Sequence, residues 1–167
     1  MSHDATLSKL QDRFGQDGFS RNEFRDNLRI VCVPERLLDM LGFLKAECGF
    51  DMLAELTAVD YLEYANARDR FGVIYGLSAT ATGERLYVKV MLNEPNLTLR
   101  SAVPLWKGAN WLEREVYDMF GIRFEGHPDL RRILMPDEFT SFPLRKDYPL
   151  RGHGERHNFP VLTRAES

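Results

Sequence analysis

Charged, aromatic and turn-forming residues are densest between positions 111 and 149, where the chain reads WLEREVYDMFGIRFEGHPDLRRILMPDEFTSFPLRKDYP. The first part of this stretch predicts a short amphipathic helix, with Asn110 as N-cap and Glu113 three residues later. Gly121 is placed to end that helix in a left-handed conformation. One face of the helix is apolar and carries Leu112, Val116, Met119 and Phe120.

Glu115 is the carboxylate of this helix that most needs a partner. Steps of about 100° per residue place it inside the apolar arc rather than on the solvated side. A buried carboxylate requires a cation, and Arg131 and Arg132 are the nearest candidates in the sequence. Arg114 and Asp118 are spaced i, i+4, so we expect them to pair on the helix surface.

The residues after the helix predict a turn followed by an extended arm. His127, Pro128 and Asp129 force the turn, and prolines recur in the arm at positions 136, 143 and 149. The apolar residues of the arm follow neither a helical nor a strand period, so they need another surface; they are Phe139, Phe142, Leu144 and Tyr148. We therefore expect an α+β domain over residues 1–135 and a partner-wrapping arm over residues 136–167.

The order of residues in this stretch resembles the signature of the C subunit of respiratory complex I, the proton-pumping NADH:quinone oxidoreductase. The resemblance begins with ERE at 113–115 and DMF at 118–120, followed by His127 and Arg131 after fixed gaps. It continues through RILMP at 132–136 and FPLRKDY at 142–148. A block this long with so many charged positions is far more specific than a lone short motif. Before Leu28 and after Pro149 the resemblance is weak.

The resemblance implies a cofactor-free structural subunit of the peripheral arm. Such a subunit docks on the D subunit near the quinone site, while FMN and Fe–S clusters in partner subunits pass electrons from NADH to quinone, coupled to proton translocation. It implies no catalytic residue in this chain, and a place at the cytoplasmic face of the bacterial inner membrane through the complex alone. The charged residues expected to fix the helix, the turn and the arm for docking are Glu113, Arg114, Glu115, Asp118, His127, Arg131 and Arg145.

The rest of the sequence predicts two more helices and a sheet. An apolar stripe at helical spacing ends at Gly15, and a second helix begins at Pro34 and ends at Gly49. Gly72 and Gly76 predict a bare strip on one strand, where a helix could approach closely. Strand-like runs cover residues 28–33, 56–64, 71–78 and 86–92. We expect an α+β fold, a roughly four-stranded, mainly antiparallel sheet with helices on one face, followed by the extended C-terminal arm.

Composition restricts the class of protein. With 167 residues, 44% of them hydrophobic and 28% charged, the chain can form one domain with a real core. The net charge of -3 and the scattered basic residues give no reason to expect a nucleic acid or an anionic membrane as partner. No apolar run approaches a membrane span, and the first residues resemble no export signal, which favours a bacterial-type cytoplasm.

Residues able to hold a cofactor are scarce. The sequence contains two cysteines, Cys32 and Cys48, whereas an ordinary Fe–S cluster takes four cysteine ligands. His153 and His157 have the i, i+4 spacing of a helical metal pair, but the glycines and proline around them favour a solvated tail. We therefore expect neither a cluster nor a metal in this chain.

Two alternative functions stay open. The chain could be the equivalent subunit of a related membrane-bound hydrogenase or of another quinone- or ferredoxin-linked dehydrogenase. The carboxylates and histidine between Glu113 and Asp129 could instead form the acid/base site of a free-standing hydrolase. The simpler interpretation is an ion-pair network that holds the arm to its domain or to a partner. Trp106 and Trp111 are predicted to be core or interface anchors.

Overall fold

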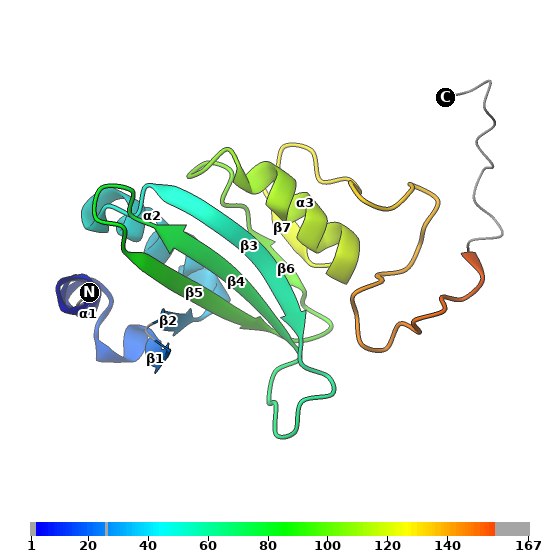
Figure 1. Cartoon of the computed structure of the whole chain (residues 1–167), viewed down its shortest axis with the longest axis horizontal. Helices are drawn as coiled ribbons and strands as arrows, with labels where there is room; N and C mark the ends of the chain where they lie inside the picture. Colours follow the sequence, from blue (N-terminus) through cyan, green and yellow to red (C-terminus); the bar gives the residue numbers. More distant parts are fainter. Residues whose placement is uncertain (1–2, 26, 156–167) are drawn as a thin grey trace.

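The fold is built on a five-stranded sheet with the strand order β1-β2-β5-β4-β3 (Figure 1). It comes from a computed structural model that describes residues 3–25 and 27–155. β2 and β5 are parallel, and the other neighbouring strands are antiparallel. The strands are β1 (Ser20–Phe24), β2 (Asn27–Cys32), β3 (Met52–Asp60), β4 (Phe71–Ser78) and β5 (Arg85–Leu92).

The predicted α+β class and the mainly antiparallel sheet are confirmed. The last three strands of the sheet are antiparallel neighbours, as the short connections between them required. The sheet has one strand more than expected, because β1, with the sequence SRNEF, is a short edge strand without an apolar alternation. β3 begins at Met52 and ends at Asp60, so the predicted run was placed several residues too late.

Three helices and a second small sheet complete the fold of the described residues. The helices are α1 (Asp4–Phe14), α2 (Leu37–Cys48) and α3 (Ala109–Phe120), with short 3-10 turns at Gln16–Gly18 and Pro34–Arg36. The small sheet pairs β6 (Thr98–Arg100) with β7 (Arg123–Glu125) in parallel. The expected helix stops are confirmed, since Gly15, Gly49 and Gly121 follow directly after the three helices. None of these helices is long and apolar enough to cross a bilayer.

The core lies between one face of the sheet and the helices. Alternate residues of β4 and β5 point into it, as in Val73, Tyr75, Val88 and Val90, which are fully buried. α2 lies behind the sheet, and α3 lies along β3 (Figure 1). Trp106 is a core anchor as expected, and its Nε1 donates to the carbonyl of Asp51 at 2.9 Å.

The prediction of a helix against Gly72 and Gly76 is wrong. Both glycines point to the sheet face opposite the helices, where side chains fill the space that their missing Cβ atoms leave. A Cβ on Gly72 would lie 2.7 Å from Lys89 Cε and 2.9 Å from the Tyr61 ring. A Cβ on Gly76 would lie 2.5 Å from Glu55 Cγ. The space above the two glycines is therefore filled by the side chains of Lys89, Tyr61 and Glu55.

Residues 127–154 form no helix or strand and continue beyond α3 as an extended chain (Figure 1). The early arm nevertheless lies against its own domain. Phe139 is only 4% exposed, and the backbone N–H of Leu144 donates to the carbonyl of Met119. Part of the surface that the arm aromatics need is thus supplied by this chain.

Candidate docking site

α3 begins one residue before the expected N-cap. Asn110 lies inside the helix, and the N-cap is Gly108, which makes no side-chain capping bond, so the predicted capping box is wrong. The C-terminal end is as expected, because Gly121 adopts a left-handed conformation with φ of 78°. A Cβ on Gly121 would also lie 2.7 Å from the ring of Phe142 and 2.8 Å from Arg145. The helix end therefore needs glycine both for its backbone and for the arm that packs on it.

The structure buries a different glutamate of α3 from the one that was expected to be buried. Glu115 is exposed, so the prediction that it is buried against Arg131 or Arg132 is wrong. Glu113 is fully buried instead. The buried line of the helix runs through positions 109, 113, 116 and 120, and Glu115 lies on the other side.

Glu113 is held without a cation. Its Oε2 accepts a hydrogen bond from Ser101 Oγ at 2.7 Å, and its Oε1 accepts one from the backbone N–H of Ala102 at 2.6 Å. None of the ion pairs found among the described residues includes Glu113. Burial raises the pKa of Glu113 to about 7, and the two hydrogen bonds offset only part of that effect. The group can therefore be protonated at neutral pH.

Arg114 fastens the segment after the turn to α3. Its Nε donates to the carbonyl of Arg131 at 3.1 Å, and its Nη2 donates to the carbonyl of Arg132 at 3.0 Å. The guanidinium lies 5.1 Å from the centre of the Trp111 ring, which is 62% exposed. The predicted pair between Arg114 and Asp118 is thus wrong, because both side chains bind the incoming segment instead.

Asp118 is the centre of the contact between α3 and residues 131–135. It is fully buried, and its Oδ1 lies 2.6 Å from Arg132 Nη1. Its Oδ2 accepts three backbone N–H groups at 2.7 to 2.9 Å, those of Ile133, Leu134 and Met135. Burial alone would raise the pKa of this carboxyl, but these bonds outweigh it and hold the pKa below its usual value. Asp118 therefore stays ionised and orders this segment.

His127 and Arg131 have smaller structural roles. His127 Nε2 lies 3.1 Å from the carbonyl of Asn110, and its Nδ1 accepts the backbone N–H of Asp129. Both ring nitrogens are thus engaged, which ties the turn to the start of α3. The Arg131 side chain pairs with Asp129 at 2.9 Å, and both side chains are more than half exposed. Arg131 is free to meet a partner surface at low cost.

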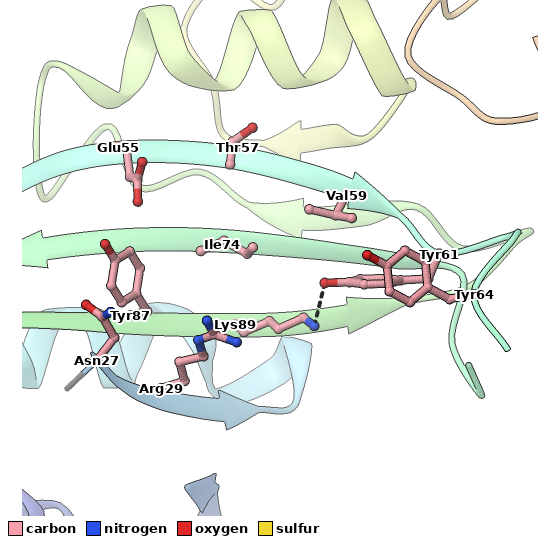
Figure 2. A pocket seen from close by; sticks show the side chains of 10 residues that line it. All are labelled: Asn27, Arg29, Glu55, Thr57, Val59, Tyr61, Tyr64, Ile74, Tyr87 and Lys89. Atoms are coloured by element: carbon pink, nitrogen blue, oxygen red, sulfur yellow. Dashed lines mark hydrogen bonds between the residues drawn. The ribbon is translucent and has the colours of Figure 1, made fainter. Parts of the chain in front are cut away.

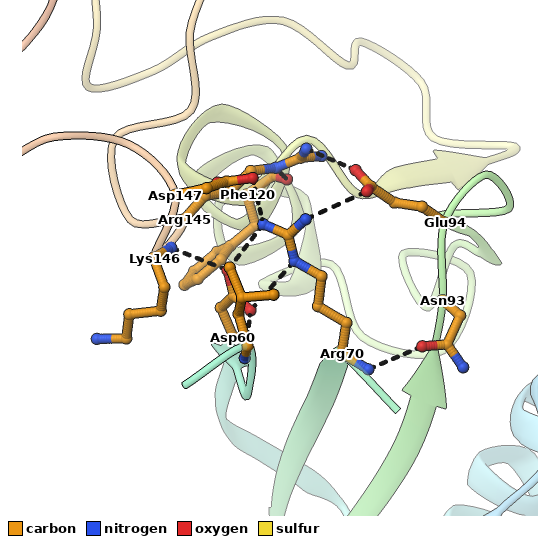
Figure 3. A network of polar contacts seen from close by, with 9 residues as sticks. Asp60, Arg70, Asn93, Glu94, Phe120, Arg145, Lys146 and Asp147 are labelled. Atoms are coloured by element: carbon orange, nitrogen blue, oxygen red, sulfur yellow. Dashed lines mark hydrogen bonds and ion pairs between the residues drawn. The ribbon is translucent and has the colours of Figure 1, made fainter. Parts of the chain in front are cut away.

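Arg145 fastens the arm to the C-terminal end of α3 (Figure 3). Its Nε donates to the carbonyl of Phe120 at 2.6 Å, and its Nη1 pairs with Glu94 at 2.9 Å. The guanidinium also lies over the Phe142 ring, 4.7 Å from its centre. A cation at this position complements the negative end of the helix dipole.

A second set of charges joins the arm to the sheet (Figure 3). Asp60, 2% exposed at the end of β3, accepts the backbone N–H of Lys146 at 2.9 Å and pairs with Arg70 at 3.2 Å. Arg70 also pairs with Asp147 at 2.7 Å and with Glu94 at 3.2 Å. Burial would raise the pKa of Asp60, but the bonds from Arg70, Lys146 and Leu62 outweigh it and keep the pKa low.

Sequence reasoning missed Asp60, Arg70 and Glu94 as members of the site. A signal for Asp60 exists, because the alternation of Leu56 and Ala58 in β3 continues to position 60 and places its carboxylate on the inner face. A buried carboxylate requires partners, although the pattern alone does not say that they come from the arm. Arg70 and Glu94 lie in connections and leave no comparable pattern.

The described residues offer no group of three or more His, Cys, Asp or Glu side chains that could hold a metal ion. Of the histidine pair considered above, His157 lies outside the described residues. Cys32 is buried, and burial raises its thiol pKa to about 12, which makes it an inert core residue. The geometry of the site is that of a clamp between a helix, a sheet end and an arm.

Comparison with known proteins decides the family. The family described as the 30 kDa subunit of respiratory-chain NADH dehydrogenase matches residues 30–154, which include the whole clamp. The chain belongs to this family. The C subunit of NADH-quinone oxidoreductase from Trichlorobacter lovleyi is 45% identical over 148 residues, 89% of this chain and 90% of the relative. Its counterpart from Geobacter metallireducens is 40% identical over 146 residues, 87% of this chain and 89% of the relative.

Solved structures with a similar fold support the architecture described above. A structure described as the trypsin-resistant fragment (1-134) of Nqo5 is 38% identical, with a TM-score of 0.68. It covers 74% of this chain and 98% of the fragment. A chain of the archaeal membrane-bound sulfane sulfur reductase reaches a TM-score of 0.77 at 19% identity, covering 96% of this chain and 93% of that chain. The second likeness supports the fold alone.

Arg145 gives a direct test of how firmly this family member holds its arm. We expect Arg145→Ala to lower the free energy of unfolding by roughly 2 kcal/mol, because a carbonyl at the helix end and Glu94 lose a charged donor. Urea unfolding followed by circular dichroism measures this change. Lys146→Ala is the matched control, since only the backbone of Lys146 joins the network, and it should change stability by less than about 0.5 kcal/mol. Equal effects would place the arm outside the folded unit.

Proposed function

We propose that this chain is a cofactor-free structural subunit of the peripheral arm of an NADH-quinone oxidoreductase, which docks on the D subunit near the quinone site. The observation that carries the proposal is the family match over residues 30–154, together with relatives named as the C subunit of NADH-quinone oxidoreductase. In this proposal FMN and Fe–S clusters in other subunits carry the electrons from NADH to quinone. The chain then meets the cytoplasmic face of the inner membrane only through the complex.

A docking patch on the outside of α3 supports the proposal; it consists of Trp111, Glu115, Arg131 and Leu134. Trp111 and Leu134 are 62% and 60% exposed, and exposed apolar surface rimmed by polar residues is typical of protein interaction sites. Trp111 and Glu115 are spaced i, i+4 and share one side of the helix, and residues 131–135 run beside it. Tryptophan and arginine are the residues that most often carry binding energy at interfaces.

The buried contacts beneath this patch make it rigid. Arg114 holds Trp111 from below and binds two carbonyls of the neighbouring segment, while Asp118 fixes the next three backbone N–H groups. A surface that is ordered before binding loses less entropy when it binds. Glu113, Arg114, Asp118, His127 and Arg145 therefore support docking from within the chain, whereas Glu115 and Arg131 can meet the partner directly.

Trp111→Ala tests the patch. In the isolated chain we expect the free energy of unfolding to change by less than about 1 kcal/mol, because the ring is mostly solvated. In the complex we expect recovery of the D subunit with the tagged chain to fall about ten-fold, because a central aromatic anchor is lost. Affinity purification in mild detergent, quantitative mass spectrometry and an NADH:quinone assay measure both effects.

Val33→Ala is the control for this experiment, since Val33 is 50% exposed and follows β2, which is separated by β5 and β4 from β3, the strand that α3 contacts. It should leave subunit recovery unchanged. If Trp111→Ala and Val33→Ala behave alike, the docking patch lies elsewhere. If the tagged wild-type chain is recovered as a lone monomer, the subunit function itself is wrong, and the carboxylates near His127 become candidates for chemistry.

The second candidate function is the equivalent subunit of a related membrane-bound complex. The fold shared with a chain of the membrane-bound sulfane sulfur reductase is consistent with this candidate. The same purification separates the two candidates. Partners that bind FMN and NADH favour an NADH-quinone oxidoreductase, whereas a neighbour with the cysteine ligands of a nickel site favours a hydrogenase-type complex.

A further inference from the structure

The face of the five-stranded sheet opposite the core is covered by no helix of the described residues (Figure 1). Alternate residues of β2, β4 and β5 point to it, and cross-strand pairing places Thr57, Ile74 and Lys89 in one row. The neighbouring row contains Glu55, Tyr87 and Arg29, joined across Gly76. This outer sheet face therefore mixes apolar, aromatic and charged side chains, and the docking patch on α3 uses none of them.

A hollow of about 420 Å³ lies in the outer sheet face (Figure 2). Ile74 lies in the middle of its floor. At one end Lys89 donates to the hydroxyl of Tyr61 at 2.8 Å and lies over its ring, and both side chains cover Gly72. At the other end Glu55 covers Gly76. The two glycines let these side chains lie flat, which leaves the apolar floor open between two polar ends.

The charge of this face differs from that of the whole chain. The outward positions of β2 to β5 carry the cations Arg29, Arg85 and Lys89 and one carboxylate, Glu55. The chain as a whole has a net charge of -3. An excess of cations on one face favours a partner surface with an excess of carboxylates.

The aromatic residues of the face also fit a protein partner. Tyr61, Tyr64 and Tyr87 line the hollow, and Tyr64 is 65% exposed. Tyrosine offers large contact area together with a hydroxyl, and it is enriched at protein interfaces. An apolar floor surrounded by tyrosines and charges matches the arrangement in which one inserted side chain is shielded from water by a polar rim.

We propose that the outer sheet face is a second docking surface, and that its occupant is an acidic segment of another protein subunit that inserts an apolar side chain over Ile74 and pairs a carboxylate with Lys89. This inference rests on the proposed function in one respect, because the occupant belongs to the same complex. It assigns the chain two interfaces on different sides. One is formed by α3 and residues 131–134, and the other by strands β2 to β5.

Zero-length coupling with a water-soluble carbodiimide tests the occupant directly, because this reagent joins a lysine amine to a carboxylate only when the two are in contact. In the purified complex we expect a peptide that links Lys89 to an Asp or Glu of another subunit. The Lys89→Arg variant keeps the charge and should lose that linkage while the complex remains intact. Acetylation of Lys89 by an activated ester should be about ten-fold slower in the complex than in the free chain.

Lys89→Glu tests the energetic part of the proposal. We expect recovery of the acidic partner to fall about ten-fold, while the free chain remains folded, because Lys89 lies at the surface of the sheet. Lys107→Glu, at an exposed lysine outside the sheet, is the matched control and should leave recovery unchanged. The thermal midpoint of each free variant separates a binding defect from a folding defect.

Three results would overturn the inference. Equal acetylation of Lys89 in the complex and in the free chain means that the face is open to solvent. Linkage of Lys89 only to a carboxylate of a second copy of this chain makes the face a self-association surface. Binding of the free chain to vesicles of anionic lipid, lost in Lys89→Glu, makes it a membrane surface. The same experiments separate this inference from the proposed function. If no oxidoreductase subunit is recovered with the wild-type chain, both fail. If the complex is recovered but Lys89 reacts as fast as in the free chain, only this inference fails.

Discussion

Asp118→Ala should lower the free energy of unfolding of the isolated chain by about 3–5 kcal/mol, the range for removing one partner of a buried ion pair. The substitution leaves Arg132 without its carboxylate, and the backbone N–H groups of residues 133–135 lose their acceptor. Residues 131–135 should then separate from α3, and Trp111 should lose its support. Urea unfolding followed by circular dichroism and by tryptophan fluorescence measures both effects.

Asp129→Ala is the matched control for this prediction. Asp129 also pairs with an arginine, but that pair is mostly exposed, so its loss should cost less than about 1 kcal/mol. A low pKa also predicts the pH dependence of the Asp118 contribution. The contribution of Asp118 to the free energy of unfolding is complete above the unfolded-state pKa, and it is lost as pH falls through the lower folded-state pKa. If Asp118→Ala costs no more than Asp129→Ala, the buried contact does not order this segment.

Much of the fold could be predicted from local patterns. The alternation in β4 and β5 and the glycines after the three helices act over a few residues, so a single sequence displays them directly. β1 was missed because an edge strand of five residues, with only Phe24 as a large apolar residue, carries almost no alternation. The parallel pairing of β2 with β5 depends on residues far apart in the chain, and no local pattern encodes it.

The error about the burial of Glu115 shows a physical limit of helical periodicity. The apolar residues of α3 form one arc that packs on the core, whereas the charged side chains of Arg114 and Asp118 face residues 131–135. The pattern gives their average direction but does not say which helix side a later segment will cover. Trp111, one turn before Glu115, is itself 62% exposed, so this edge of the helix is solvated. Only the structure shows that residues 131–135 cover the side of α3 that carries Arg114 and Asp118.

The arm illustrates the same limit over a longer distance. Asp60 binds the backbone of Lys146, which lies 86 positions later, and Arg70 pairs with Asp147. Each bond joins a strand end to a segment without any periodicity. The division into a domain of residues 1–135 and an arm of residues 136–167 therefore remains a prediction, and these contacts show that Lys146 and Asp147 of the arm pack on the chain's own domain.

Glu113 combines features that predict an unusual pH dependence. Its carboxyl is fully buried and accepts two hydrogen bonds from neutral donors, so nothing nearby compensates a negative charge. The neighbouring Tyr75 hydroxyl is also buried, and it has no hydrogen-bond partner among the described residues. Burial, with a smaller contribution from Glu113, raises the pKa of Tyr75 well above its ordinary value. The buried surroundings of Tyr75 and Glu113 thus favour neutral groups.

We therefore expect Glu113→Gln to stabilise the chain relative to the wild type as pH rises. The folded-state pKa of about 7 lies above the ordinary value of 4.5, so between these two pH values the folded state binds more protons than the unfolded state does. The stabilising contribution is complete below the ordinary pKa and is lost as pH rises through 7. By pH 8 the difference in unfolding free energy between the variant and the wild type should have changed by roughly 3 kcal/mol in favour of the variant. Glu115→Gln, two residues away and exposed, is the control and should show no such change between pH 4.5 and pH 8. If the two variants gave parallel pH profiles, Glu113 would be ionised without cost in the folded chain, which would mean that water or a cation reaches it.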